Sequence, residues 1–203
     1  GSVDVAVDFT VPSSTEANVH ALLDAGIHAV VGTTGWEESS LDRIRAHAST
    51  RPDIGVLIAP NFALSAVLSM RFAAVAARYF ASAEVVEMHH PRKVDAPSGT
   101  AVHTAHGIAA ARSQAGLGAM ADATTQSLPG ARGADVDGIN VHSLRLEGLV
   151  AHEQIFLSNP GELLTIRTDS FDRISFMPGV LLAIREVAAR PGVSVGLETY
   201  LDL

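Results

Sequence analysis

Cysteine is absent from the sequence, which excludes a disulfide framework and a thiolate metal site. Long apolar runs are also missing, and none approaches the ~20 residues that a membrane-spanning helix needs. No stretch has the charged start, short apolar segment and small-residue cleavage site of a secretory signal peptide. These absences predict a cytoplasmic protein without a membrane partner.

Basic residues are scarce and almost all of one kind. The 203-residue chain has a net charge of −8 at pH 7, and it has no basic stripe to neutralise phosphates, which argues against nucleic acid as a partner. Lys and Arg together number 14, yet Lys93 is the only lysine. A single lysine can arise by chance. The functional interpretation is that arginine cannot replace it, because only lysine can lose its proton near neutral pH when buried.

The first part of the chain alternates between strand and helix patterns. Hydrophobic residues make up 47% of the sequence and aromatic residues only 5%, so a core of Ala, Val and Leu is expected. Ser13 and Glu16 have the spacing of a capping box that opens a helix, and Gly26 is placed to end it. Strands are expected at 3–9, 27–31 and 54–58, with helices between them, and this order predicts a parallel sheet with crossover helices.

The pattern changes after residue 61, where helices and strands no longer alternate. Runs of strands after an α/β segment predict a second, α+β domain with an open, mixed and largely antiparallel sheet. We expect residues 1–63 and 173–203 to form the first domain and residues 64–172 the second. The expected elements are helices at 64–80, 98–112 and 172–190, strands at 83–89, 139–146, 150–157 and 163–168, and a return of 193–201 to the first domain.

Two short motifs follow strands of the expected parallel sheet. Gly32-Thr33-Thr34-Gly35 and Ala59-Pro60-Asn61-Phe62 both lie at the carboxyl edge of the sheet, where nucleotides bind in open α/β folds. Pro60 ends its strand, which is expected to leave the Asn61 amide and the Phe62 ring facing the crevice. The first motif is equally consistent with an ordinary turn between a strand and a helix.

The segment from Glu87 to Thr100 carries the strongest chemical signal. Strand alternation places Glu87 and His89 on one face and Met88 and His90 on the other. Lys93 follows in the loop, and Ser98, Gly99 and Thr100 begin a helix whose first-turn amides are expected to lack intrahelical partners. An imidazole, an ammonium and a helix N-terminus together indicate a site for an anionic substrate that must be protonated.

Other interpretations of these residues remain open. His89 and His90 are also consistent with hydrogen-bonded histidines at a strand end. With His103 and His106 they are candidate metal ligands of a hydrolase, although the neighbouring ammonium opposes a cation. Arg173 is either a surface cation or a substrate contact. Arg132, His142, Ser143 and Arg145 are expected to serve sheet packing and solvation.

The runs Glu87–His90 and Lys93–Ala101 resemble the signature of dihydrodipicolinate reductases, now called 4-hydroxy-tetrahydrodipicolinate reductases. The segments 7–10, 32–35, 59–62 and 132–145 match the same family in order, and the similarity looks greatest to actinobacterial members. The resemblance implies a Rossmann-like parallel sheet, a substrate-binding and oligomerisation domain at 64–172, and a homotetramer. It also implies NADH- or NADPH-dependent reduction of a cyclic dicarboxylate to tetrahydrodipicolinate in lysine biosynthesis.

The resemblance further assigns roles to single residues. His89 and Lys93 would be the catalytic proton-transfer groups. The substrate would be bound by His90, Ser98, Gly99, Thr100 and, as a weaker match, Arg173. The nicotinamide side of the cofactor would be contacted by Gly32, Thr33, Thr34, Ala59, Pro60, Asn61 and Phe62, and no metal is implied.

One family feature is missing from the sequence. The family begins with a strand and a glycine-rich phosphate loop, and no G-x-x-G-x-x-G run occurs in this sequence. We therefore expect an incomplete first domain that lacks on the order of 30 residues or more of a βαβ unit. The polypeptide alone should bind dinucleotide poorly, and a tight isotherm in calorimetric titration with NADH would contradict this. The alternative function is a truncated, non-catalytic dicarboxylate-binding and oligomerisation module.

Overall fold

The computed structural model describes residues 3–201, and residues 1–2 and 202–203 at the ends of the predicted first domain lie outside the described part. The chain divides into two compact units. Unit 1 comprises the chain up to Leu64 and again from Phe176, and unit 2 comprises Ser65–Ser175. No helix within residues 3–201 has both the length and the apolar character to cross a membrane.

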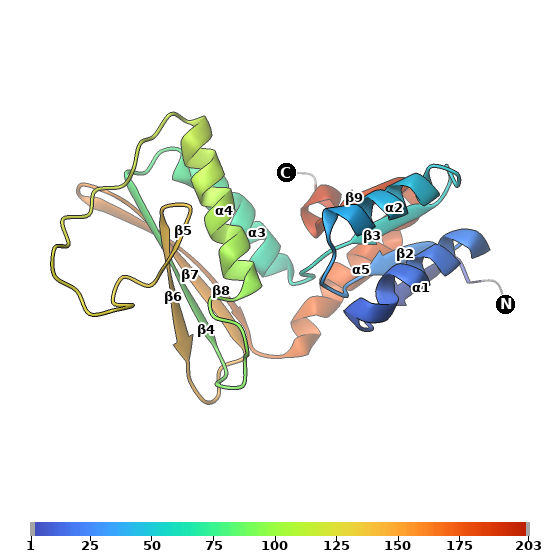
Figure 1. Cartoon of the computed structure of the whole chain (residues 1–203), viewed down its shortest axis with the longest axis horizontal. Coiled ribbons are helices and arrows are strands. Elements are labelled where there is room, and N and C mark those ends of the chain that lie inside the picture. Colours follow the sequence, from blue (N-terminus) through green and yellow to red (C-terminus); the bar gives the residue numbers. More distant parts are fainter. Residues whose placement is uncertain (1–2, 202–203) are drawn as a thin grey trace. The chain divides into compact units, whose positions relative to one another are not determined.

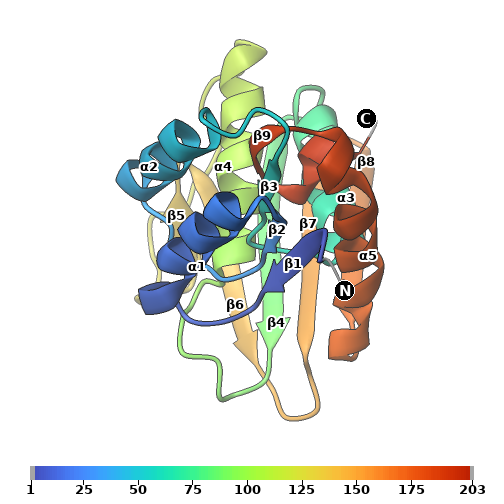
Figure 2. The same cartoon turned by 90° about the vertical axis from the view of Figure 1, so that its right-hand side faces the viewer.

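Unit 1 contains a four-stranded parallel sheet in the order β1-β2-β3-β9, which confirms the predicted α/β pattern. Figure 2 shows α1 and α2 on one side of the sheet and α5 on the other. Asp8, Val31, Ile58 and Val195 end neighbouring strands in register, so the loops that follow them start from the same edge. The elements are β1 (Val5–Asp8), α1 (Pro12–Ala25), β2 (His28–Val31), α2 (Glu38–Ala48), β3 (Gly55–Ile58), α5 (Met177–Glu186) and β9 (Gly192–Val195).

The predicted capping box at the start of α1 is wrong. The helix begins at Pro12, with Val11 as its N-cap and no side-chain capping hydrogen bond. Proline is favoured at the first helical position because its missing N–H would have no intrahelical partner there. Glu16 binds Arg43 of α2 instead. Gly26 does end the helix in the left-handed conformation, with φ of 71°, as predicted.

The predicted helix at 172–190 is divided into three pieces. A 3₁₀ helix at Arg173–Phe176 precedes α5, and a second one at Val187–Ala189 follows it. Pro178 lies in the first turn of α5, so it begins the helix rather than interrupting it. After this segment β9 pairs with β3, which confirms that the end of the chain rejoins unit 1.

Unit 2 contains a five-stranded mixed sheet in the order β5-β6-β4-β7-β8. Strands β4 and β6 are parallel, and the other pairs are antiparallel. Helices α3 and α4 cover one face (Figure 1), where Val85, Ile108 and Ile155 are completely buried. The elements are α3 (Leu64–Ala77), β4 (Ser82–His89), α4 (Gly99–Gln114), β5 (Ala134–Val136), β6 (Ile139–Arg145), β7 (Ala151–Asn159) and β8 (Glu162–Ser170).

Strand β5 was not expected, because the sequence between 113 and 138 reads as a loop rich in Gly, Ala and Asp. Its three residues are too few to show the two-residue alternation of a strand. They become a strand by pairing with β6 through a tight turn at Asp137 and Gly138, both of which have positive φ. Residues 115–133 form no helix or strand.

Candidate functional site

The residues predicted to contact a cofactor lie at the carboxyl edge of the unit 1 sheet. Asp8, at the end of β1, is buried and binds Thr33 Oγ1 at 2.7 Å and Asn18 Nδ2 at 2.8 Å. Burial raises the pKa of Asp8, but the hydrogen bonds from Asn18, Thr33 and Thr10 outweigh it and lower the pKa. The Thr33 hydroxyl therefore holds the turn after β2, while Thr34 is exposed.

The segment Ala59–Phe62 follows β3 at the same edge, but its ring is not placed as expected. The prediction that the Phe62 ring faces a crevice is wrong, because the residue is only 3% exposed. Its ring packs edge-on against Phe9, with centroids 5.6 Å apart. Pro60 is exposed and Asn61 is half-buried, with its Oδ1 accepting a hydrogen bond from the Ala63 amide.

This edge fits the nicotinamide end of a dinucleotide by the type of groups it presents. Gly35, in the turn after β2, has a φ of 89°, a conformation that favours glycine. Gly32 is half-buried and Thr34 exposed, and both precede α2. Backbone amides and small polar groups at the carboxyl ends of parallel strands are the usual setting for a nucleotide.

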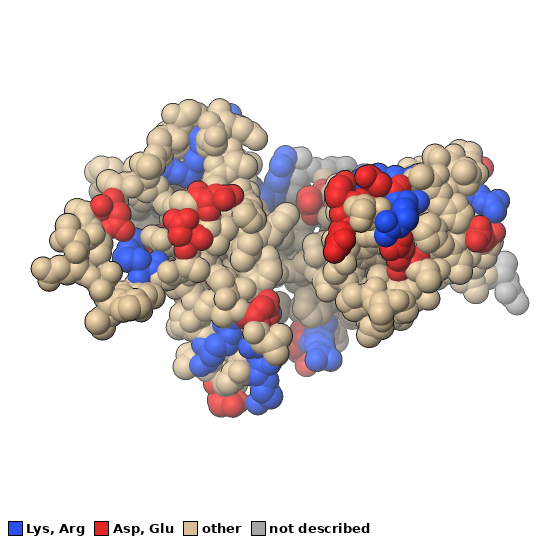
Figure 3. Space-filling model, viewed as in Figure 1, with Lys and Arg blue, Asp and Glu red and all other residues tan. Residues whose placement is uncertain are grey.

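The second group of predicted residues gathers at one end of the unit 2 sheet. His89 ends β4, Lys93 lies in the following loop, and Ser98 is the N-cap of α4. The β4–α4 loop lies beside the β6–β7 turn (Figure 1), and the Leu146 amide donates a hydrogen bond to the His89 carbonyl. Figure 3 shows acidic and basic side chains mixed at this end of the unit.

Glu87 binds His89, as the shared face of β4 suggested. The His89 Nδ1 atom lies 2.6 Å from Glu87 Oε2, and the Glu87 side chain is completely buried. Arg145, which was expected to serve sheet packing and solvation, binds both Glu87 oxygens at 2.8 Å. Burial raises the pKa of Glu87, but hydrogen bonds from His89 and Arg145 outweigh it and lower the pKa to about 2.

The Ser98 and Gly99 amides at the start of α4 have no intrahelical partner, as expected, but side chains from outside the helix accept hydrogen bonds from both. The Ser98 amide donates to Glu87 Oε1 at 3.1 Å, and the Gly99 amide donates to Asp95 Oδ2 at 3.3 Å. Asp95 also accepts a hydrogen bond from Lys93 Nζ at 2.7 Å. The Lys93 ammonium and the start of α4 therefore hold one carboxylate between them, and that carboxylate belongs to the chain.

The remaining predicted substrate contacts differ in their surroundings. His90 Nδ1 is buried and has no hydrogen-bond partner within residues 3–201. Ser98 is only 3% exposed, and its hydroxyl accepts from the Ala101 amide as a helix cap. Thr100 is half-buried. Arg173 lies in the 3₁₀ helix after β8 and is exposed.

Glu153 is a buried carboxyl that the sequence did not single out. It lies on β7 directly opposite Glu87 of β4 and is 5% exposed. Burial raises the pKa of Glu153 to about 7, and the negative charge of Glu87 adds to the rise. The Thr104 hydroxyl lies 2.8 Å from Glu153 Oε1 and 3.0 Å from the Thr100 carbonyl. Because one hydroxyl hydrogen serves only one acceptor, a protonated Glu153 fits this position.

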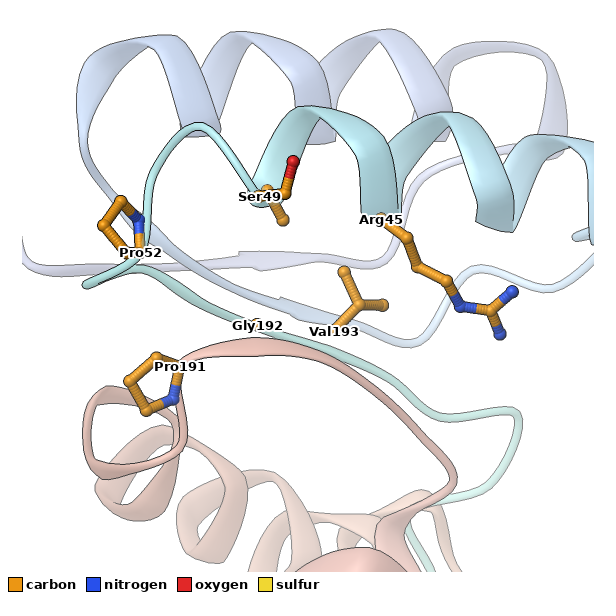
Figure 4. Close-up of a pocket in the computed structure, with 7 residues that line it drawn as sticks. Arg45, Ser49, Pro52, Pro191, Gly192 and Val193 are labelled. Carbon is orange, nitrogen blue, oxygen red and sulfur yellow. The ribbon is translucent and has the colours of Figure 1, made fainter.

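Neither a metal cluster nor a hollow in unit 1 points to another site. No group of three or more His, Asp or Glu side chains in the described range is placed to hold a metal, and His106 pairs with Asp137. A hollow of about 300 Å³ lies between α2 and β9, away from the predicted residues. Figure 4 shows Pro52 and Pro191 at one end and the Arg45 side chain, which binds Glu38 and Asp42, extending at the other.

The family comparisons cover nearly the whole chain. Residues 1–62 match the family model "Dihydrodipicolinate reductase, N-terminus", and residues 65–201 match "Dihydrodipicolinate reductase, C-terminus". The 4-hydroxy-tetrahydrodipicolinate reductase of Beutenbergia cavernae is 73% identical over all of this chain and 82% of its own length. That of Corynebacterium aurimucosum is 60% identical over 98% of this chain and 81% of its own.

A solved structure shows the same similarity in three dimensions. It is the dipicolinate-bound dihydrodipicolinate reductase from a Paenisporosarcina species, with a TM-score of 0.88 and 42% sequence identity. The match covers 98% of this chain and 74% of that one.

Proposed function

The chain belongs to the dihydrodipicolinate reductase family, and from this premise we propose which of its residues perform each part of the reaction. It is an NAD(P)H-dependent oxidoreductase that reduces 4-hydroxy-tetrahydrodipicolinate to tetrahydrodipicolinate in the diaminopimelate and lysine pathway. This identification favours the enzyme over the non-catalytic module. Unit 1 is proposed to bind the dinucleotide, and unit 2 to bind the substrate and to form the oligomer.

When bound, NADH or NADPH supplies the hydride. We assign its nicotinamide end to the carboxyl edge of the unit 1 sheet, where Gly32, Thr34, Pro60 and Asn61 are accessible. Thr33, Ala59 and Phe62 are buried, so they contribute through their backbone and by holding the two turns in place.

The substrate carboxylate is assigned to Lys93 and the first turn of α4. The observation that carries this assignment is the position of Asp95, whose carboxylate binds the Lys93 ammonium and the Gly99 amide together. The related structure from Paenisporosarcina has dipicolinate bound, which is a cyclic dicarboxylate. We propose that a substrate carboxylate exchanges with Asp95 at these donors, and that His90 and Thr100 complete the binding.

Protonation of the substrate is assigned to Lys93 and His89. Both lie at the end of β4 and its following loop, within the segment that also supplies the carboxylate donors. Holding proton donor and carboxylate site in one short segment fixes the ring for proton transfer, which is the main advantage of a pre-organised site. Arg173 is proposed as a further contact to a carboxylate.

The assignment is tested by following the loss of NADH or NADPH with freshly generated substrate. Turnover that is inhibited competitively by dipicolinate against the substrate is the expected result. Inhibition that is competitive against the dinucleotide instead would place the dicarboxylate in the wrong unit.

Replacing Asp95 with Asn should strengthen dipicolinate binding. The variant removes the negative charge that competes for Lys93 and keeps a side chain of the same size. Asp95 is 48% exposed, and exposed ion pairs contribute about 0.2–1 kcal/mol, so the gain should be at most about five-fold. Calorimetric titration measures it. Asp137→Asn, which removes an exposed carboxylate from its pair with His106, serves as the control and should change nothing. Weaker binding in Asp95→Asn would contradict the exchange.

The oligomer is proposed to be a homotetramer formed through the unit 2 sheet, in the cytoplasm. Helices α3 and α4 cover one face of this sheet, and among the described residues Leu144 and Leu163 are exposed at 38% and 62%. Light scattering coupled to size-exclusion chromatography measures the mass, and a monomer at micromolar concentration would contradict the proposal.

A further inference from the structure

We propose that Glu87 is the positioning residue for His89, and that it leaves Nε2 of that imidazole as the only ring atom able to exchange a proton with the substrate. The inference rests on the proposed role of His89. It extends the site to Glu87 and Arg145, to which the sequence assigned no catalytic role. The supporting feature is a single buried carboxylate that accepts hydrogen bonds from His89, Arg145 and the Ser98 amide.

The two oxygens of Glu87 accept hydrogen bonds from three parts of unit 2, and the Ser143 side chain on β6 is a further hydrogen-bond partner that lowers the Glu87 pKa. Oε2 accepts from His89 Nδ1 at 2.6 Å and from Arg145 Nη1 at 2.8 Å. Oε1 accepts from Arg145 Nη2 at 2.8 Å and from the Ser98 amide at 3.1 Å. An ionised carboxylate has only acceptor sites, so every neighbour at this distance must bring the hydrogen. Nδ1 of His89 therefore carries a hydrogen whether the ring is neutral or charged.

The second ring nitrogen of His89 is in a different situation. In the described part of the chain Nε2 forms no hydrogen bond, and the His89 side chain remains 14% exposed. A proton that His89 gives or takes must pass through this atom, because release from Nδ1 would place a bare nitrogen lone pair against a buried carboxylate.

Arg145 stabilises the buried Glu87 carboxylate and connects it to the loop between β4 and α4. Its guanidinium is 20% exposed, balances the charge of Glu87 and also donates to the Asp95 carbonyl at 2.7 Å. Bidentate pairing of this kind fixes direction as well as charge. The Ser98 amide, at the start of α4, donates a hydrogen bond to the same carboxylate. One side chain thereby sets the position of His89 relative to both the loop of Lys93 and the helix that begins at Ser98.

A second cluster in the same sheet has the same composition without this arrangement. Asp169 of β8 binds His152 Nδ1 at 2.7 Å and Arg167 at 2.8 Å. The other nitrogen of His152, Nε2, accepts from the Val150 amide at 3.3 Å, so neither ring nitrogen is available for exchange. Asp169→Asn therefore disrupts an equivalent Arg–carboxylate–His cluster and provides a matched control.

The first test needs no change to Glu87. Spectra of the enzyme labelled with ¹⁵N-histidine distinguish the two neutral tautomers, and the signal of His89 is assigned by its loss in His89→Gln. The spectra are recorded at a pH at which His89 is neutral, and the expected result there is a hydrogen on Nδ1. A neutral His89 with its hydrogen on Nε2 would overturn the proposal, whatever the variants do.

The second test is kinetic. Glu87→Gln keeps the shape of the side chain but turns one acceptor atom into a donor that faces the donors of Arg145 or Ser98. We therefore expect kcat to fall by about 100-fold, within the 10²–10⁴-fold range of general acid–base catalysis. The KM for the dinucleotide should stay within two-fold, roughly the scatter of such measurements, because Glu87 lies in unit 2. Asp169→Asn should retain kcat.

A double variant separates positioning from general damage. If Glu87 acts through His89, adding Glu87→Gln to His89→Gln should cause no further loss of kcat. A full additional loss in the double variant would show a merely structural role and overturn the inference. A different result would contradict the proposed role of His89 itself, namely normal turnover in the single variant His89→Gln. Loss in His89→Gln with normal turnover in Glu87→Gln would overturn only the inference drawn here.

Discussion

Lys93→Ala is expected to reduce kcat by about 10²- to 10⁴-fold, the usual contribution of a general acid or base. Lys93 is the chain's only lysine, and its side chain is 21% exposed beside Asp95. The variant removes both the proposed proton donor and one of the groups that hold the substrate carboxylate. Affinity for the dinucleotide should be preserved, because the residues assigned to the cofactor belong to unit 1. Steady-state kinetics measures both quantities, as kcat and as the KM for the dinucleotide.

Lys93→Arg distinguishes proton donation from charge. Arginine keeps the positive charge but does not release its proton in proteins, so dipicolinate binding should largely survive while kcat is still lost. Arg92→Ala is the control. The Arg92 side chain is 74% exposed, and its ion pair is with the exposed Glu147, at 3.6 Å between Nη1 and Oε1. Normal turnover in Lys93→Arg would show that Lys93 acts through its charge alone.

Glu153→Gln is expected to remove a pH dependence of stability and to stabilise the protein at pH 8 by about 3 kcal/mol. Burial raises the pKa of Glu153 from 4.5 to about 7, so the folded state holds this proton more tightly than the unfolded chain does. Its contribution to stability is fully present below pH 4.5 and is lost as the pH rises through about 7. At pH 5 the variant and the parent should differ by no more than about 1 kcal/mol, the usual net value of a hydrogen bond.

Urea unfolding at several pH values between 5 and 8 measures this difference. Glu87 does not interfere in that range, because its lowered pKa of about 2 places the loss of its stabilisation below pH 4.5. Glu162→Gln, at the exposed start of β8, is the control and should keep the pH dependence of the parent. An unchanged slope in Glu153→Gln would show that Glu153 is already ionised at neutral pH.

Much of the fold could be predicted because the signals for its elements are local. Alternation over a few residues identified β4 and placed Glu87 and His89 on one face, and Gly26 marked the end of α1. The start of α1 was predicted less well, since the helix begins at Pro12, whose fixed φ suits the first helical position, and Ser13 does not cap it. Strand β5 exists only through pairing, which no local pattern of three residues reveals.

The candidate site was predicted in the same uneven way. The family signature identified His89, Lys93 and the helix start at Ser98, which lie within ten positions of one another along the chain. Arg145 lies 58 positions from Glu87 along the chain and was expected to serve sheet packing and solvation. Nothing in the local pattern showed that β6 would lie beside β4, in parallel, with Arg145 level with His89.

The sequence by itself determined most of the strands and helices, the strand ends that carry the polar motifs, and the segment that contains the proposed proton-transfer residues. These features depend on interactions within a few residues, such as alternation, helix termini and proline geometry. Only the tertiary structure decided that Arg145 would pair with Glu87 and that the buried Glu153 would lie opposite Glu87. It also decided that the Asp95 carboxylate would accept hydrogen bonds from Lys93 and the Gly99 amide. Those contacts depend on strand order and register, which are set by burial across the whole sheet.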